Sequence, residues 1–390
     1  MVTCAARIPS VELYAVIPLS ELQKQGLCEF RYKNEMSLLP SDIGWCDILF
    51  MVRGTSYHSV WAAQWAKKRE RIVLGYWDDY LLGIPDHSLS YPPSSSSEVG
   101  ANIRILFKLT DAFFSPNPKL AAKLSALHGK DVQVLPIVQG MERTEPPKLR
   151  KPQWPIVGYS GGLVHITILD SLVGPVISEV AATGANLRLH IVGPKPDFVG
   201  KLKVETIHTP PTRNYYDYLA LASKLEWDIG LAPQIDDEFT TYKTYIKLLD
   251  YTYIGCAGIY TKIEPYLGTI EDGVTGLLVP NEVEAWRDAI LKLLKDPELR
   301  FKIASNAYEF ARSHHSKEFV VQKYAAALTP FLSHRAPDVS RSYVLWRDQA
   351  HRFSNVYKTA VEYIRLFGIR RFLRRAPRYI VSSLRRKPQA

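Results

Sequence analysis

Short apolar runs alternate with longer amphipathic segments through most of the chain. In the first third, runs rich in Val, Ile, Leu and aromatic residues predict buried strands at 11–18, 47–52, 71–77, 112–116 and 132–138. Between them, the segments 19–26, 59–70 and 118–129 carry apolar side chains at helical spacing and predict helices. Because strands that alternate with helices usually pair in parallel, the pattern predicts an α/β layered domain.

The same plan restarts after a polar, proline-rich stretch at 141–155, which predicts an interdomain linker. Beyond it the pattern predicts strands at 154–161, 187–193, 228–233, 258–262 and 276–280, and helices at 168–184, 214–225 and 282–296. We therefore expect one doubly wound domain over 1–145 and a second over 146–333. Ligands of such folds bind where the carboxyl ends of the strands meet, so the expected site is a cleft between the domains.

The composition narrows the class of protein. The chain has 390 residues, of which 46% are hydrophobic and 23% charged, and this mixture excludes wholesale disorder. Its four cysteines are scattered without a Cys-x-x-Cys pair, which argues against a disulfide framework or a structural zinc site and favours a reducing compartment. Neither a signal peptide nor an apolar run of about 18 residues is visible, so no membrane-spanning helix is expected.

The segment from Thr241 to Tyr253 holds the strongest candidate chemistry. We expect it to form a helix that Thr240 or Thr241 caps, with Lys243, Lys247 and Asp250 on one face. Two ammonium groups beside a helix N-terminus suit a diphosphate, and Asp250 can accept hydrogen bonds from a ribose diol. The alternative is a solvated face with a Lys247–Asp250 ion pair.

A resemblance favours the first interpretation. Residues 156–307 carry, in order, VGYSGGLVH, LHIVG, DIGLAP, the lysine-bearing segment, IGCAGIYTKIEPY, DGVTGLLV and WRDAILKLLKDPELRFKIASNA. This series resembles the nucleotide-sugar-binding domain of retaining glycosyltransferases of family 4, which have the GT-B fold. The resemblance implies two Rossmann-like domains facing a cleft, with the donor against the second domain and the acceptor against the first.

The resemblance also implies roles for single residues. It assigns the donor to Gly161, Gly162, Lys243, Lys247 and Asp250. His165 then either reaches the phosphate or sugar or only begins a helix. The family often has two glutamates separated by seven residues on this segment. Here Asp250 takes the second position and Tyr242 the first, so a sugar contact of the family is missing, unless Asp236, Asp237 or Glu238 replaces it.

The first half resembles a subgroup of these transferases more loosely. Arg53 follows one expected strand, and Asp78 and Asp79 follow the next, so all three are expected at strand ends facing the cleft. Arg53 is then an acceptor-side residue, and an aspartate positions the acceptor hydroxyl or acts as general base. The alternative is that the aspartates cap a turn or helix.

These inferences lead us to expect a specific chemistry. The catalytic set is Asp78, Asp79, His165 and Lys247. The resemblance implies that the leaving phosphate helps to take the acceptor proton, and positive charge around the diphosphate stabilises its departure. No cofactor or metal is expected, because the resemblance requires none and the sequence has no Asp-x-Asp motif.

The basic charge of the chain lies in its last residues. From 335 to 390 there are 14 Lys and Arg against 3 Asp and Glu, giving 14 − 3 = +11, while the whole chain is +10. From Tyr357 onward, arginines alternate with Tyr, Phe, Leu and Ile, which predicts a basic amphipathic helical extension over 334–390. Binding to an anionic membrane surface is the favoured role. Packing against the protein and binding to nucleic acid are the alternatives, although no base-reading module accompanies the charge.

The expected function is a cytoplasmic glycosyltransferase, peripheral to the inner face of the membrane. It would transfer sugar from a nucleotide-sugar to a glycan or lipid-linked acceptor, with retention. The alternatives are a non-catalytic GT-B subunit that binds sugar nucleotide or glycan and supports a partner enzyme, and a sugar-nucleotide epimerase.

Overall fold

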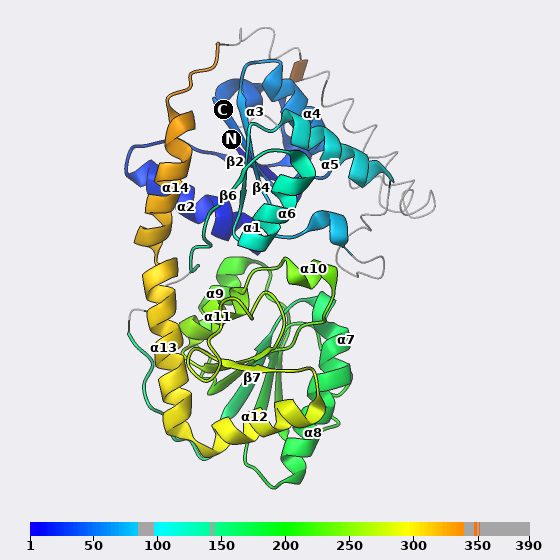
Figure 1. Cartoon of the computed structure of the whole chain (residues 1–390), viewed down its shortest axis with the longest axis vertical. Helices are drawn as coiled ribbons and strands as arrows, with labels where there is room; N and C mark the ends of the chain where they lie inside the picture. The colour runs from blue at the N-terminus through cyan, green and yellow to red at the C-terminus, as the bar shows by residue number, and fades with distance from the viewer. Residues whose placement is uncertain (85–96, 141–142, 144, 339–346, 349–350, 352–390) are drawn as a thin grey trace.

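The chain folds into two halves, each built on a six-stranded parallel sheet with helices on its faces (Figure 1). The computed structural model describes every residue except 85–96, 141–142, 144, 339–346, 349–350 and 352–390. Two parallel sheets with flanking helices confirm the doubly wound α/β prediction for both halves.

The first sheet has the strand order β2-β1-β3-β4-β5-β6. Its strands are β1 (Val2–Cys4), β2 (Tyr32–Asn34), β3 (Ile48–Val52), β4 (Ile72–Tyr76), β5 (Ala112–Ser115) and β6 (Val132–Val134). The helical elements around it are α1 (Pro9–Val11), η1 (Glu12–Val16), α2 (Ile17–Lys24), η2 (Glu35–Ser37), α3 (Pro40–Trp45), α4 (Tyr57–Lys67), η3 (Leu81–Gly83), α5 (Ser97–Leu109) and α6 (Pro118–His128). The central strands β3 and β4 are buried along nearly their whole length, which is why they appear in the sequence as unbroken apolar runs.

The second sheet has the order β12-β11-β10-β7-β8-β9. Its strands are β7 (Ile156–Ser160), β8 (Arg188–Val192), β9 (Glu205–Thr209), β10 (Ile229–Ala232), β11 (Ala257–Thr261) and β12 (Leu277–Val279). Its helical elements are η4 (Leu163–His165), α7 (Ile166–Ile168), η5 (Leu169–Val173), α8 (Gly174–Ala182), α9 (Tyr215–Ala222), α10 (Glu238–Thr241), α11 (Ile246–Ile254) and α12 (Val283–Lys295).

The chain order reverses once in each sheet, and these reversals locate the expected ligand sites. In the second sheet the reversal lies between β7 and β10, and in the first it lies between β1 and β3. Loops at such a switch point diverge and leave space at the carboxyl ends of the strands. The expected ligand sites are therefore the segments that follow β1, β3, β7 and β10.

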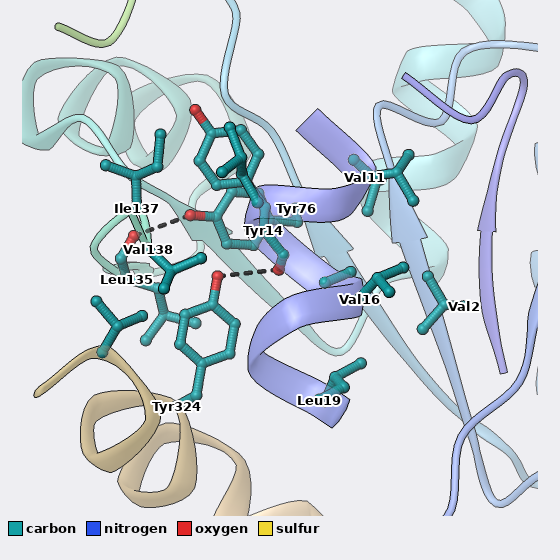
Figure 2. Close-up of a cluster of buried hydrophobic side chains, with 14 of the residues drawn as sticks. Val2, Val11, Tyr14, Val16, Leu19, Tyr76, Leu135, Ile137, Val138 and Tyr324 are labelled. Carbon is teal, nitrogen blue, oxygen red and sulfur yellow. Dashed lines mark hydrogen bonds between the residues drawn. The ribbon is translucent and has the colours of Figure 1, made fainter. Parts of the chain in front are cut away.

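The last two described helices join the halves. Helix α13 (Pro297–His315) packs on the second half, and α14 (Lys317–Leu332) runs back along the first half beside α2 (Figure 1). Figure 2 shows the Tyr324 hydroxyl of α14 donating to the Tyr14 carbonyl, at 2.9 Å, inside a large apolar cluster. The expected second domain ended at residue 333, so it includes a helix that covers the first half.

One predicted strand is wrong. Residues 11–18 are helical, formed by the end of α1, the π-helical turn η1 and the start of α2. The run is buried on all sides, so it has no polar face to reveal the helical period, and a short apolar run of this kind does not distinguish helix from strand. The strand of this region is β1, which is only three residues long.

The predicted helix from Tyr357 lies outside the described residues. Within the described part of the chain, no helix is both long and apolar enough to cross a membrane.

Candidate active site

Arg53 and two aspartates form a compact charged group at the carboxyl ends of β3 and β4. The Arg53 guanidinium donates to both carboxylate oxygens of Asp78, each at 2.5 Å, and its Nη2 lies 2.7 Å from Asp79 Oδ2. All three side chains are largely buried, between 4% and 11% exposed. Arg53 has a left-handed backbone with φ 54°, and its N–H donates to the Tyr76 carbonyl. The aspartates therefore pair with an arginine, and among the described residues η3, the turn that follows them, has no side-chain cap.

A glycine pair follows β7, at the switch point of the second sheet. A Cβ on Gly161 would lie 2.0 Å from the Tyr159 hydroxyl, so this position requires glycine. The Gly161 N–H donates to the Val192 carbonyl and is not free for a ligand. Around Gly162, a Cβ would meet open space. Of the two, Gly162 is therefore the residue whose backbone a ligand can approach.

Lys247 lies in the first turn of α11 and points at the end of β7. Its Nζ donates to Ser160 Oγ at 3.2 Å and to Asp250 Oδ2 at 2.9 Å. The side chains of Lys247 and Asp250 are only 14% and 10% exposed. Because an ammonium has three N–H donors, one remains after these two bonds, and it has no protein partner within the described residues.

Lys243 does not lie on the helix predicted for it. Residues 238–254 form two helices, α10 and α11, and Lys243 lies in the connection between them. Asp237, not a threonine, caps α10 by accepting from Thr240 N at 2.7 Å, and α11 has no side-chain cap. The predicted single helix over 241–253 is therefore wrong, because the aspartate starts a short helix earlier in the chain.

The broken helix still brings Lys243 into the same group of charges. Burial lowers the pKa of Lys243, and the positive charges of Arg53 and Lys247 act in the same direction, whereas Asp79 and Asp237 oppose them. The Lys243 ammonium therefore interacts electrostatically with charged groups of both halves. It packs over the Phe239 ring, 4.8 Å from the centroid, and forms no hydrogen bond or ion pair with the described residues.

His165, at the end of η4, belongs to this group as well. Desolvation by the surrounding protein, together with the charges of Lys243 and Lys247, lowers the pKa of His165 to about 3. The ring is therefore neutral at ordinary pH. A neutral imidazole beside two ammonium groups can accept or donate a hydrogen bond, but it is not a proton donor of the imidazolium kind.

Tyr242 occupies the position of the missing family carboxylate and packs between the halves. Its ring meets Tyr80 edge to face at 5.0 Å, and Lys123 lies over both rings. The three neighbouring acids lie in different surroundings. Asp237 caps α10, Glu238 pairs with Lys123 at 3.3 Å, and Asp236 is exposed.

The sequence interpretation missed four polar residues of this region. They are Ser160 and Tyr218, hydrogen-bonded to each other at 3.1 Å beside Lys247, and Tyr14 and Asn117, which reach across from the first half. Asn117 did carry a signal, because Asn-Pro at 117–118 is a helix start, but nothing in the sequence indicated its second partner.

Two surface cavities lie away from this group. One is lined by Met1, Cys28, Trp45 and Arg335 among others, and the second by Pro152, Thr183 and Leu291 among others. Neither is lined by a residue of the predicted site. In the residues that the structure describes, no cluster of three or more His, Cys, Asp and Glu side chains is arranged to hold a metal ion.

Part of the chain matches the model of a known protein family. Residues 246–310, from the start of α11 into α13, match the family model described as "Glycosyl transferases group 1". The match includes Lys247 and Asp250 and begins just after Lys243. No curated protein is significantly similar to the chain in sequence.

Solved structures show the same fold at low identity. HepE from Anabaena, in complex with UDP and glucose, is similar with a TM-score of 0.58 and 14% identity, over 84% of this chain and 98% of HepE. The lipopolysaccharide outer core galactosyltransferase WaaB, in its apo form, gives 0.53 and 13% over 84% and 98%. A candidate UDP-N-acetylglucosamine 2-epimerase from Listeria monocytogenes gives 0.55 and 14% over 87% and 98%. The chain therefore has the GT-B fold, and its match to the glycosyl transferases group 1 model begins in α11, the helix that follows β10 at the switch point of the second sheet.

Proposed function

We propose that the chain is a glycosyltransferase that moves a sugar from a nucleotide-sugar donor to a glycan or lipid-linked acceptor, with retention and without a metal. The main support is the convergence of Lys247, Lys243 and the neutral His165 beside Gly162, opposite Arg53 and its aspartates. The group 1 segment and the UDP complex of HepE favour a nucleotide-sugar as donor.

The chemistry follows from the charges of this group. A departing nucleoside diphosphate gains negative charge as the sugar becomes oxocarbenium-like, so fixed positive groups beside it lower the barrier. Lys247 is held by Ser160 and Asp250 and retains one N–H donor for a phosphate oxygen. Asp250 has a second oxygen for a ribose hydroxyl. On the opposite side, Asp79 is the carboxylate that positions the acceptor hydroxyl, while Asp78 holds Arg53 in place.

Removal of the Lys247 ammonium tests the donor site. Lys247→Ala should weaken binding of the preferred nucleoside diphosphate about 10- to 100-fold, because a charged hydrogen bond is lost. Titration calorimetry with UDP, GDP, ADP and dTDP identifies the preferred base in the wild type and then measures the variant. Lys302→Ala, an exposed lysine on α13, is the matched control and should bind like the wild type. Equal affinity of Lys247→Ala and wild type would exclude the proposed role.

A non-catalytic GT-B subunit is the second candidate function, and Tyr242 is the observation that favours it. Its ring packs at the interface, at the position where the family that the chain resembles often has a carboxylate, while the nearby acids Asp237 and Glu238 are engaged with α10 and Lys123. The two functions differ in turnover. A catalytic chain hydrolyses or transfers its donor sugar when purified alone, whereas a supporting subunit binds the donor without consuming it.

We also propose that residues 335–390 hold the protein on an anionic membrane surface at the cytoplasmic side. Support comes from their net charge of +11 and from where this segment begins. The Asp348 carboxylate accepts from Ser41 N at 3.0 Å at the start of α3, and the His351 ring stacks on Trp61 of α4 at 3.7 Å. The basic segment therefore starts on the first half, which is the acceptor side of the proposed reaction, and a lipid-linked acceptor would approach from the same membrane.

A further inference from the structure

The connection between α10 and α11 belongs to the second half by chain order, but the first half holds it. Asn117 Nδ2 donates to the Lys243 carbonyl at 2.6 Å, and the Tyr14 hydroxyl is hydrogen-bonded to Thr244 Oγ1 at 3.1 Å. Tyr242, the residue before them, packs on the Tyr80 ring. Three consecutive residues of this connection thus each contact the opposite half.

An apolar anchor next to the connection strengthens this attachment. Phe239 of α10 is only 4% exposed and lies in a hydrophobic cluster that otherwise comes from the first half, with Trp77, Tyr80 and Phe107 among its members. Burial of a large apolar ring away from water favours this attachment. The segment 239–244 is therefore fixed to the first half by one buried ring and two hydrogen bonds.

The two residues that make these hydrogen bonds are themselves rigidly placed. Asn117 caps α6 through its Oδ1, which accepts from Lys119 N at 2.8 Å and Leu120 N at 3.2 Å. Tyr14 is 2% exposed and stacks on Tyr76 with the ring centroids 4.9 Å apart (Figure 2). Each side chain is held at one end and presents its remaining polar group to the connection.

The two lysines of the site therefore depend on different parts of the molecule. Lys247 is supported by Ser160 and Asp250, both in the second half. The Lys243 ammonium forms no hydrogen bond or ion pair with the described residues, so the position of the Lys243 backbone decides where the ammonium lies. That backbone is held by Asn117 directly and by Tyr14 through the next residue.

We infer that Asn117 and Tyr14 are positioning residues for Lys243 and that, through them, donor binding is coupled to the apposition of the two halves. This inference rests on the proposed function, because it takes the donor diphosphate as the ligand of Lys243. In a closed molecule both ammonium groups meet the diphosphate. When the halves separate, Lys247 keeps its place and Lys243 loses its support.

The Asn117→Asp variant isolates the positioning role. The aspartate keeps the oxygen that caps α6, so the fold is maintained, but it loses the N–H₂ donor and faces the Lys243 carbonyl with a carboxylate oxygen. Tyr14→Phe removes the second hydrogen bond and keeps the stacked ring. Tyr216→Phe is the matched control, because its hydroxyl also crosses between the halves, to Glu12 at 2.7 Å, without touching the connection.

The experiment measures the dissociation constant of the nucleoside diphosphate that the wild type prefers among UDP, GDP, ADP and dTDP. We expect about tenfold weaker binding for Asn117→Asp, a severalfold loss for Tyr14→Phe, and wild-type affinity for Tyr216→Phe. In a Lys243→Met background, Asn117→Asp should cause little further loss, since a positioning residue acts only through the group it positions.

Each outcome separates this inference from the proposed function. If Asn117→Asp and Tyr14→Phe bind as tightly as the wild type while Lys247→Ala does not, the coupling is excluded and the donor site stands. Full additivity of Asn117→Asp and Lys243→Met also overturns the inference, because Asn117 then acts by another route. If the wild type binds none of the four diphosphates, the proposed function fails and the coupling fails with it.

Discussion

Arg53 pairs with two aspartates at once, Asp78 and Asp79, in a region almost closed to water. Its planar fork allows a bidentate bond to Asp78 and leaves Nη2 within reach of Asp79. Loss of one partner of such a buried group costs more than the group contributes, since the remaining charges stay desolvated.

Substitutions in this group should therefore differ in cost. Arg53→Met removes the guanidinium that pairs with two buried carboxylates and should lower the free energy of unfolding by about 3–5 kcal/mol, whereas Asp79→Asn keeps the Arg53–Asp78 pair and should cost clearly less. Urea denaturation measures both. Arg312→Met removes an exposed pair with Glu309 and should change stability by about 1 kcal/mol or less. Similar losses for Arg53→Met and Asp79→Asn would contradict the shared-charge interpretation.

For single residues, the sequence indicates which side chains belong to the site better than it indicates which residues they contact. Lys247 and Asp250 are three residues apart, and helical spacing alone predicts that they meet. Tyr14 and Thr244 are separated by 230 residues, and Asn117 and Lys243 by 126. No local pattern encodes such pairs, because they form only when the two sheets face each other.

Among the elements outside the site, the end of α13 holds a buried titratable side chain, His315. His315 is 2% exposed. Its Nδ1 lies 2.8 Å from the Ile137 carbonyl, and its Nε2 lies 3.2 Å from the hydroxyl of Tyr245, the residue that precedes α11. A neutral ring that donates from Nδ1 and accepts at Nε2 satisfies both partners. Burial lowers the pKa of His315 to about 4, since an imidazolium would lose water there and the Tyr245 hydroxyl could no longer donate to it.

This depression predicts how stability depends on pH. The unfolded chain takes up a proton near pH 6.5 and the folded chain only near 4, so the contribution is complete above pH 6.5 and is lost as the pH falls toward 4. The loss from His315 amounts to at most about 3 kcal/mol. His165 and His128, whose pKa values are lowered to about 3 and about 4, act in the same direction.

Unfolding free energies measured between pH 7.5 and 4.5 check this expectation. His315→Gln should flatten the decline, whereas His314→Gln, an exposed neighbour on the same helix, should keep the wild-type slope. An unchanged slope in His315→Gln would place the titrating groups elsewhere.

The elements also show where pattern recognition works. The central strands β3, β4, β7 and β10 follow from their apolar runs, because burial on both faces leaves the same signature in any parallel sheet. The same apolar signature led to a wrong strand prediction at 11–18, because that segment is a helix buried on all sides. The break between α10 and α11 was not predicted, because Thr240 and Thr241 were expected to cap the helix, whereas Asp237 caps α10.

In the molecule as a whole, the net positive charge is concentrated near the end of the chain. Residues 352–390 hold 11 Lys and Arg against 1 Glu, and the remaining residues come close to neutrality. Asp348 and His351, described residues just before this segment, contact α3 and α4, and a chain that ends after His351 keeps these two contacts.

A chain that ends after His351 should therefore fold and bind nucleotide as before but lose its attraction to anionic vesicles. Each basic residue near such a surface contributes about 1 kcal/mol. Sedimentation with vesicles that contain phosphatidylserine should fall from most of the protein to little of it. Replacement of Arg370, Arg371, Arg374 and Arg375 by glutamine in the full chain tests charge without changing length. Equal sedimentation of the full and shortened chains would reject membrane binding by this segment.

The return of α14 to the first half means that the first half is not one contiguous stretch of sequence. A recombinant piece that stopped near residue 145 would expose Tyr14, Leu19 and Leu22, which now lie in one apolar cluster with Val320, Tyr324 and Leu328. Splicing residues 317–332 onto its end would restore that cover. Domain exchange between this chain and its structural relatives would likewise have to transplant two separate pieces of the gene together.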